Sequence, residues 1–178
     1  MISFNSYGLF GLFEKTVCVE TDSQERDGVI YLLNKTKPFS GKNLCKYENG
    51  QNKSKGIIKD GKWNGKATYW YKKGQIKFER TYKFGQIERE KNYQNGELIG
   101  LTHYQYNENG QIEKVEYYKD NQLSGETEYI YFVNGQMGSE VNYKDGKLDG
   151  KQTYWSENGQ IQIENNYKDD ECISGDWC

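Results

Sequence analysis

Hydrophobic and polar residues alternate along most of this chain, in short stretches separated by turn signals. In the stretch IKFERTY, Ile76, Phe78 and Tyr82 fall on one side of an extended backbone, and Lys77 and Glu79 fall on the other. Asn-Gly, Asp-Gly or similar pairs, which tolerate the positive φ of a tight turn, bound each stretch. A helix would need apolar residues at a spacing of about 3.6 and would be weakened by such frequent glycines. The pattern therefore predicts antiparallel β-hairpins.

The hairpins repeat with a period of 24 or 25 residues. Successive turn signals are separated alternately by 11 and by 13 or 14 residues, and one extra 11-residue unit stands at 85–96. A single hairpin cannot bury its own apolar face, whereas stacked copies can. We therefore expect an all-β fold, an elongated, open and twisted antiparallel array of stacked β-hairpins with short capping segments.

The expected organisation is an N-terminal arm or cap at 1–26, the repeat array at 27–175 and a short tail at 176–178. Within these limits, 17–47 and 171–178 are the candidate capping segments. The sequence DGVIYLLNKTKPFSGK, at 27–42, has the form of a degenerate first hairpin. The opening MISFNSYGLFGLFEK has no basic residue before its apolar part, which favours a short disordered or capping arm over a signal peptide.

Glycine recurs in the middle of the longer stretches, where it normally weakens a strand. A recurring strand glycine often marks the close approach of another group, and we expect aromatic rings from a neighbouring strand to lie over these positions. Tyrosines four residues further on share the glycine face and are expected in the core. The glycines are Gly65, Gly100, Gly125 and Gly150, and the tyrosines are Tyr69, Tyr104, Tyr129 and Tyr154.

An apolar stripe is expected on the opposite, charged face of the same stretches. It consists of Trp70, Ile130 and Trp155, with Gln105 at the equivalent position of the remaining copy. Such a stripe is either a contact surface or part of a covered second layer. Carboxylates follow the same period and are interpreted as a solvated face. Three of them are candidate partner contacts, Glu88, Glu90 and Glu113.

Composition supports a folded chain with little core. Leu, Ile, Val and Phe make up only 34 of 178 residues, but the chain contains 16 Tyr, whose rings can be buried while their hydroxyls stay hydrated. The formal net charge is −2, and no basic run stands out. This balance gives no general attraction to nucleic acid or anionic lipid, and membrane insertion is not expected because no apolar stretch is long enough.

No catalytic, cofactor-binding or metal-binding motif is present, so we expect no enzymatic activity, no cofactor and no metal. His103, the single histidine, is interpreted as a surface substitution on a repeat strand. The four cysteines lack the spacing of a zinc site. Cys172 and Cys178 can close a short loop in an oxidising compartment, or they are free thiols in a terminal cap. Compartment stays open, with a slight preference for the cell envelope or exterior.

The recurrent phrase YxNGQIxxExxYKDGKLxG, seen with small changes at 106–125, 131–150 and 154–175, resembles the bacterial variant of the MORN repeat. The resemblance covers about 41–175. Asn121 and Asp170 replace turn glycines, and the extra unit at 85–96 also departs from the pattern. The resemblance implies a row of β-hairpins that binds or scaffolds, and many bacterial members are described as antitoxin-like or immunity-like.

Four kinds of partner follow from this resemblance and from the exposed aromatics. A protein partner, either a toxin or an envelope protein, is the leading expectation, because Tyr and Trp are enriched at binding hot spots. An envelope glycan stacked on exposed rings is the alternative. Membrane contact is disfavoured by the missing basic amphipathic stretch. Self-association through an open sheet edge needs no other ligand.

Overall fold

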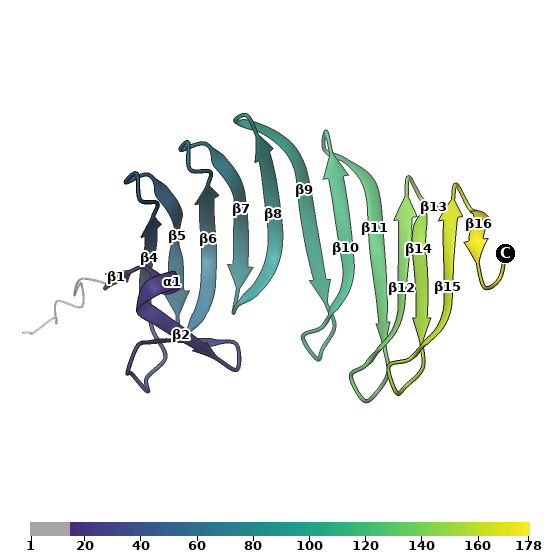
Figure 1. Ribbon diagram of the computed structural model, residues 1–178, viewed down its shortest axis with the longest axis horizontal. Coiled ribbons are helices and arrows are strands. Elements are labelled where there is room, and N and C mark those ends of the chain that lie inside the picture. The colour runs from purple at the N-terminus through teal and green to yellow at the C-terminus, as the bar shows by residue number, and fades with distance from the viewer. Residues whose placement is uncertain (1–14) are drawn as a thin grey trace, which may run out of the picture.

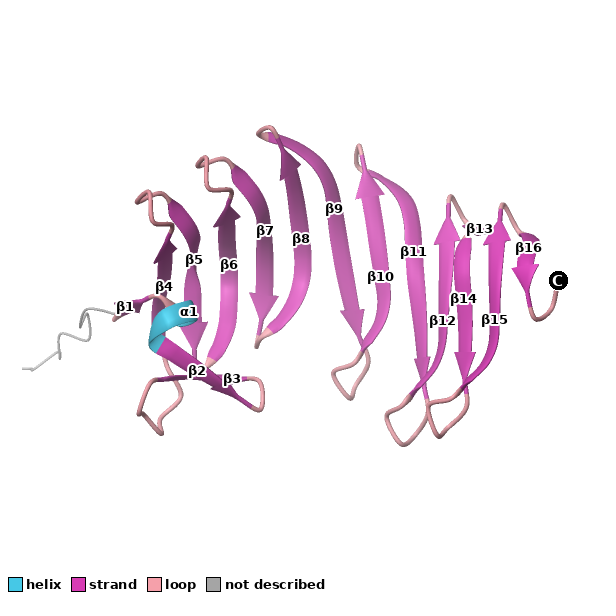
Figure 2. Ribbon diagram, viewed as in Figure 1, coloured by secondary structure: helices cyan, strands magenta, loops and turns pink. Residues whose placement is uncertain are grey.

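The computed structural model describes residues 15–178, and these form one long open sheet with a small cap at its N-terminal end (Figures 1 and 2). The sheet has 14 strands, and their spatial order follows the chain, as expected for stacked hairpins. All neighbouring strands are antiparallel except β1, which pairs with β4 in parallel. The prediction of an all-β, open array of hairpins is therefore confirmed.

The strands of this sheet are β1 (Thr16–Val17), β4 (Gly41–Lys46), β5 (Asn52–Lys59), β6 (Lys62–Trp70), β7 (Ile76–Lys83), β8 (Gln86–Gln94), β9 (Glu97–Tyr106), β10 (Ile112–Lys119), β11 (Gln122–Tyr131), β12 (Met137–Lys144), β13 (Lys147–Leu148), β14 (Gly150–Trp155), β15 (Ile161–Lys168) and β16 (Glu171–Gly175). The cap contains α1 (Val19–Asp22), β2 (Ser23–Arg26) and β3 (Val29–Leu32). Within residues 15–178 no helix is long and apolar enough to cross a membrane.

Two kinds of turn alternate along the sheet except around β8, where two narrow turns follow each other, and each kind follows from its sequence. At the KDG-type signals the chain reverses over two residues of positive φ, as at Asp60 (49°) and Gly61 (77°). At the NGQ-type signals it uses a wider turn; in one of these the Gly74 amide donates to the Tyr71 carbonyl, and the Tyr71 amide donates to the Gln75 carbonyl. Asn and Asp at these positions adopt positive φ at a small cost, so the turn signals fix where each strand ends.

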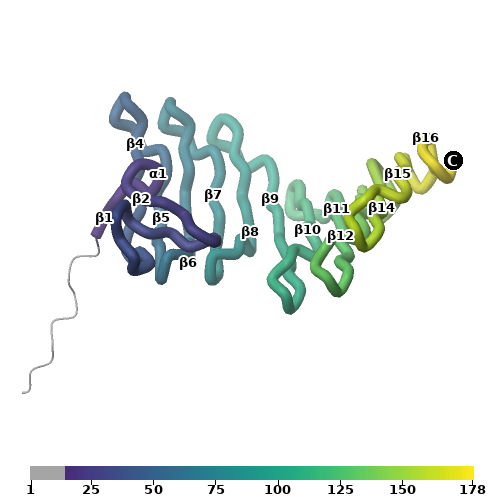
Figure 3. Tube along the Cα trace, turned by 60° about the horizontal axis from the view of Figure 1, so that its bottom comes forward, coloured from purple at the N-terminus to yellow at the C-terminus, as the bar shows by residue number. Residues whose placement is uncertain are grey.

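The sheet changes direction near its middle, between β8 and β10 (Figure 3). This is where the extra 11-residue unit inserts β8, an additional strand that interrupts the alternation of short and long units. The strands on the two sides therefore form an N-terminal half, β4–β8, and a C-terminal half, β9–β16.

An aliphatic core lies under the N-terminal cap. Val17, Ile30 and Phe39 from the cap segment pack on Ile58 of β5, and the partly buried ring of Trp63 borders the cluster. The cap hairpin is formed by β2 and β3 and makes a separate two-stranded sheet. The hairpin expected over 27–42 is present in part: β3 follows the turn at Asp27 and Gly28, and the chain then returns to it, with an antiparallel bridge between Tyr31 and Pro38 and the Phe39 amide donating to the Ile30 carbonyl.

A disulfide bond between Cys18 and Cys45 fastens this cap to β4. Beside it, the side chain of Asn43 is fully buried; its amide oxygen accepts from the Val19 amide at 3.0 Å, and its amide nitrogen donates to the Ser54 hydroxyl at 3.0 Å. These hydrogen bonds satisfy a buried polar side chain that would otherwise destabilise the cap. Sequence analysis did not predict this pairing of cysteines.

Residues that face one another across a ladder project to the same side of the sheet, so the registers assign each side chain to one of two faces. We call the side that carries Ile58, Tyr69 and Phe78, and that the cap contacts, the cap face. The other side, which we call the Trp70 face, carries Trp70 and the row of partners Lys55, Thr68, Glu79, Lys91, Leu101 and Tyr118.

The difference between 13-residue and 14-residue units changes which residues share a face. In the first full hairpin Tyr69 pairs with Phe78, so the tyrosine lies on the same side as the Ile76-to-Tyr82 anchors. In the next hairpin Tyr104 pairs with Val115, so it lies on the side opposite to the anchor Tyr118. The hairpin containing Tyr129 follows the second arrangement, and the one containing Tyr154 follows the first. One extra residue before the turn moves the tyrosine to the side opposite its own hairpin's anchors.

The expectation that aromatic rings lie over the recurrent glycines is wrong for three of the four. No atom lies within 4 Å of a Cβ built on Gly65, and only a backbone carbonyl or an Asn142 carbon does so at Gly100 and Gly150. Gly65 and Gly150 have positive φ, 70° and 100°, at irregular points of the strands. At Gly125 the nearest atom is the Tyr143 carbonyl oxygen, and a ring carbon of Tyr117 lies further off, at 3.9 Å.

The ring-covered glycine of the N-terminal half is instead Gly56 of β5. A Cβ on this residue would lie 2.7 Å from the ring of Trp63, and it would also crowd Ala67. Trp63 reaches this position from β6 and stacks on Tyr82 with a centroid separation of 5.7 Å. The glycine is needed here because the indole occupies the space of its missing side chain.

The C-terminal end of the sheet is closed by a small loop. Cys172 of β16 forms a disulfide bond with Cys178, the pair singled out from the sequence. The loop places the ring of Trp177 on Tyr154, with centroids 6.2 Å apart, and the Trp177 amide donates to the buried amide oxygen of Asn165. The residues expected as a tail, 176–178, therefore shorten the exposed edge of the sheet.

Candidate binding surface on the Trp70 face

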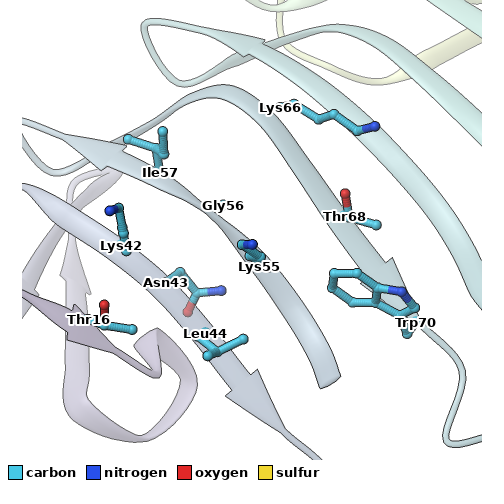
Figure 4. Close-up of a pocket in the computed structure, with 10 residues that line it drawn as sticks. All are labelled: Thr16, Lys42, Asn43, Leu44, Lys55, Gly56, Ile57, Lys66, Thr68 and Trp70. Carbon is cyan, nitrogen blue, oxygen red and sulfur yellow. The ribbon is translucent and has the colours of Figure 1, made fainter. Parts of the chain in front are cut away.

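A hollow with a volume of about 460 Å³ lies on the Trp70 face of the N-terminal half (Figure 4). It crosses β4, β5 and β6, and Lys66, Thr68 and Trp70 follow one another along its β6 side. Its lining is formed by Thr16, Lys42, Asn43, Leu44, Lys55, Gly56, Ile57, Lys66, Thr68 and Trp70. Gly56 borders the hollow by its backbone, because its missing side chain faces Trp63 on the cap face.

Apolar and cationic groups share this hollow. Leu44, Ile57 and Trp70 give it an apolar surface, and Ile57 is 44% exposed although its neighbour in sequence is fully buried. Trp70 is half-buried, and the carbonyl oxygen of its own backbone accepts the hydroxyl of Tyr47 at 2.7 Å. That hydrogen bond fixes the end of β6, so the indole is held by a rigid strand terminus instead of a free loop.

A second, smaller hollow of about 200 Å³ adjoins the first and shares Lys66 with it. Its other lining residues are Glu79, Thr81, Arg89 and Lys91. Lys66 makes an ion pair of 2.5 Å with Glu79, the single carboxylate in either hollow. Because that carboxylate is already paired, the two hollows together present an excess of positive charge.

Tyr93 completes the edge of this surface on β8. Its hydroxyl donates to the Glu79 carboxylate at 3.2 Å, and desolvation together with that negative charge raises the pKa of the Tyr93 phenol. The hydroxyl therefore remains protonated and a hydrogen-bond donor throughout the neutral range. Glu79 thus holds both Lys66 and Tyr93, and it organises the surface without being available to a partner.

The structure separates the residues of the expected apolar stripe. Trp70, Gln105 and Ile130 lie on the Trp70 face. Trp155 lies on the cap face, because Thr153, two residues before it on β14, pairs with Glu140 of that face. Ile130 is 66% exposed and far along the sheet from the hollow. Of the four, Trp70 alone lines the large hollow.

The expected tyrosine row is separated as well. Tyr69, Tyr104 and Tyr129 lie on the cap face and are half-buried, whereas Tyr154 lies on the Trp70 face, paired with Ser139. Burial raises the pKa of the Tyr104 and Tyr129 phenols, which agrees with rings packed along the sheet.

The three candidate carboxylates do not form a common surface with Trp70. Glu90 lies on the cap face, where its carboxylate pairs with the guanidinium of Arg80 at 2.5 Å and accepts from Asn92 at 3.1 Å. Glu88 stands at the irregular end of β8, and Glu113 is exposed next to the turn before β10. None of them lines either hollow.

No metal-binding cluster appears in the part of the chain that the structure describes. Within residues 15–178 no three His, Cys, Asp or Glu side chains come together in a way that could hold a metal ion. His103 is half-buried; it packs on Tyr118 with centroids 4.9 Å apart and lies 4.0 Å from Glu116. His103 therefore packs within the Trp70 face, whereas a simple surface substitution is expected from the sequence.

Charge segregation along the chain is the feature that sequence reasoning missed. Residues 1–94 contain 18 Lys and Arg against 10 Asp and Glu, a formal charge of +8, and residues 95–178 contain 6 against 16, a formal charge of −10. The overall −2 hides this division, and no single run of basic residues reveals it. A comparison of the charges of the two halves of the sequence would have found it.

Comparison with known proteins identifies the repeat and little else. Three segments, 63–84, 100–120 and 148–169, match the family model of the MORN repeat variant, and they cover β6–β7, β9–β10 and the region from β13 to β15. No curated protein matches the chain. These repeats indicate a repeat scaffold for binding.

Among solved structures, the crystal structure of the GtfA/B complex bound to UDP and GlcNAc matches with 17% sequence identity and a TM-score of 0.22. The match covers 51% of this chain and 18% of that one, so this chain corresponds to less than a fifth of the matched chain. A likeness at this level supports no conclusion about fold or activity.

Proposed function

We propose that this chain is a non-enzymatic repeat scaffold that binds a protein partner through the hollow beside Trp70. The observation that carries the proposal is an indole held at a rigid strand end, next to exposed Ile57 and between lysines. Trp is the residue type most enriched at binding hot spots, and an apolar anchor within a charged rim is the usual anatomy of such sites. The partner would place an apolar side chain in the hollow and carboxylates on Lys55 and Lys66.

A more specific form of the proposal is an antitoxin-like or immunity-like protein that occludes a toxin. A rigid sheet can cover an active cleft by shape and charge alone, without chemistry of its own. Two disulfide bonds suit a protein that works in an oxidising compartment. The basic hollow reverses the sign of the contact expected from sequence, because it favours an acidic toxin surface over a basic one.

The experiment is a quantitative pulldown from lysate of the source organism with three baits, the wild type, Trp70→Ala and Trp155→Ala. The two tryptophans lie on opposite faces, so the second variant is a matched control for the loss of an indole. Recovery of one polypeptide by the wild type and by Trp155→Ala, with roughly 30-fold weaker binding to Trp70→Ala, supports the proposal.

Two other results would contradict it. Equal recovery by all three baits would remove the Trp70 hollow from the interface. Recovery of envelope glycan with no stoichiometric polypeptide would replace a protein partner with a carbohydrate. If a polypeptide is recovered, inhibition of its toxicity by the wild type but not by Trp70→Ala distinguishes an immunity-like protein from a general scaffold.

A further inference from the structure

We infer that the Trp70 face of the N-terminal half binds the Trp70 face of the C-terminal half on a second copy of this chain. The formal charges of the two halves of the sequence, +8 for residues 1–94 and −10 for residues 95–178, are opposite and nearly equal. Each copy therefore carries both a surface and its electrostatic complement. This inference does not depend on the identity of any other partner.

The basic side of this contact is the double hollow described above. Lys55 on β5 and Arg89 and Lys91 on β8 lie on the Trp70 face by register. Lys55 lines the large hollow, and Arg89 and Lys91 line the small one. Ile57 and Trp70 supply apolar area next to these cations.

The acidic side lies on β10 and β11 of the same face. Glu116 pairs directly with Glu126 in the ladder, and Glu128 is the next residue on that side of β11. Lys114 offsets part of this charge, with its ammonium 2.8 Å from Glu126 and 3.3 Å from Glu128. Three carboxylates against one ammonium leave the cluster negative, and Ile130, 66% exposed, adds apolar area beside it.

These two surfaces cannot fully neutralise each other within one molecule. In the continuous hydrogen-bonded sheet, Lys55 on β5 is five strands from Glu116 on β10, whereas Arg89 on β8 is two strands away, in the same row across His103. At a spacing of about 4.8 Å per strand these separations are about 24 Å and about 10 Å, and the first is well beyond the Debye length of about 8 Å at physiological ionic strength. Arg89 can therefore offset part of the charge of Glu116 in its own chain, but Lys55 can meet these carboxylates only through a second molecule.

Contact between copies would cover the hollow that contains Trp70. A second copy and a protein partner would therefore compete for the same surface, and the partner would bind only the dissociated chain. The contact is heterologous in character, because two different patches meet; it closes into a dimer if the second pair of patches can also meet, and otherwise continues from copy to copy.

The test is sedimentation velocity over a dilution series at about 50 mM and about 500 mM NaCl, a range that changes electrostatic screening severalfold. The wild type should associate at low salt and dissociate at high salt, with the apparent dissociation constant rising roughly tenfold or more. Reversal of the basic patch (K55E/R89E/K91E) or of the acidic patch (E116K/E126K/E128K) should abolish association. Combining both sets in one chain should restore it.

Matched controls make the same changes in net charge away from the contact. K35E/K72E/K73E alters the cap loop and a turn, and E108K/E157K/E171K alters turns and the end strand; all six residues are exposed. Both control variants should associate like the wild type. Equal loss of association in these controls would show that net charge, and not the two patches, is responsible.

The inference is overturned if the wild type is a monomer at low salt, or if association does not respond to salt. It is also overturned if the combined variant is folded, by near-UV circular dichroism, and still fails to associate. Where a reversal variant does not fold, the neutral sets K55Q/R89Q/K91Q and E116Q/E126Q/E128Q replace it, and each should weaken association roughly tenfold. Loss of association at Trp70→Ala alone would show an apolar contact without the charge pairing.

Discussion

Ile57 and Ile58 offer a test of how this sheet divides stability from binding. They are adjacent on β5 and chemically identical, but they point to opposite faces. Ile58 is 1% exposed and packs under the cap against Val17, Ile30 and Phe39. Ile57 is 44% exposed and lines the hollow on the Trp70 face. Changing each to alanine removes the same atoms from two different environments.

The expected losses follow from burial. Ile→Ala removes about three carbon groups, worth about 2.4 kcal/mol when fully buried, and the cavity left under a cap fastened by a disulfide adds about 1 kcal/mol more. Ile58→Ala should therefore lower the free energy of unfolding by about 3.5 kcal/mol. Ile57→Ala loses roughly half of the transfer contribution and leaves no closed cavity, so its cost should be about 1 kcal/mol.

Urea unfolding followed by tryptophan fluorescence measures both values, with the wild-type slope as a check that the transition is unchanged. Binding should show the reverse order, because Ile57→Ala weakens contact at the hollow while folded Ile58→Ala does not. Equal destabilisation by the two variants would refute the assignment of the core to one face of β5. A loss of unfolding free energy below about 1 kcal/mol for Ile58→Ala would also refute it, because truncating a fully buried isoleucine costs more than this.

Three further results are expected. Replacing Cys18 and Cys45 by serine should cost about 3.5 kcal/mol by the chain-entropy relation for their separation of 27 residues, measured by urea unfolding; an unchanged midpoint would mean that the cap holds without its disulfide. Folding raises many tyrosine pKa values above 10.0, mainly by desolvation, so the unfolded chain loses phenolic protons first and stability should fall as pH rises above about 10; an unfolding free energy that stays constant there would contradict this. The tyrosines concerned are Tyr69, Tyr93, Tyr104, Tyr106, Tyr118, Tyr129, Tyr131 and Tyr143. The hydrogen bond from Lys168 lowers the pKa of Asp149 below its ordinary 3.8, and Lys168→Ala should return it upward in an NMR titration of the carboxyl carbon; no change would show that the pair does not persist in solution.

The repeat architecture was predictable because its determinants are local. An Asp-Gly pair such as Asp60 and Gly61 specifies a turn through the φ values that these residues tolerate, independently of the remainder of the chain. Alternation of apolar and polar residues between such turns specifies a strand, and each hairpin buries its apolar face against the hairpins next to it in sequence. Fold class, strand order and approximate strand limits all follow from these short-range rules.

The cap was not predictable by the same reasoning. Its sequence does not repeat, and its core unites Val17, Ile30, Phe39 and Ile58, which are neighbours only after the sheet has formed. The pairing of Cys18 with Cys45 depends on the same long-range arrangement, whereas Cys172 and Cys178 lie six residues apart and could be paired from sequence. Contacts distant in sequence leave no periodic signal.

The facial assignment failed for a more instructive reason. Residues at equivalent positions of the repeat, such as Trp70 and Trp155, are expected on one face of the sheet. The turns fix the register, however, and each residue added between two turns moves the residues after it to the opposite face. The repeat therefore specifies where strands begin and end without specifying which side a given residue faces. A surface on such a sheet is set by the places where the period is broken: the edge strand β1, whose Thr16 lines the Trp70 hollow, the extra strand that brings Arg89 and Lys91 beside it, and the exchange of lysines for carboxylates beyond residue 94. All three breaks coincide at or border the N-terminal half of the Trp70 face, which is why binding should be sought there and not along the regular repeats.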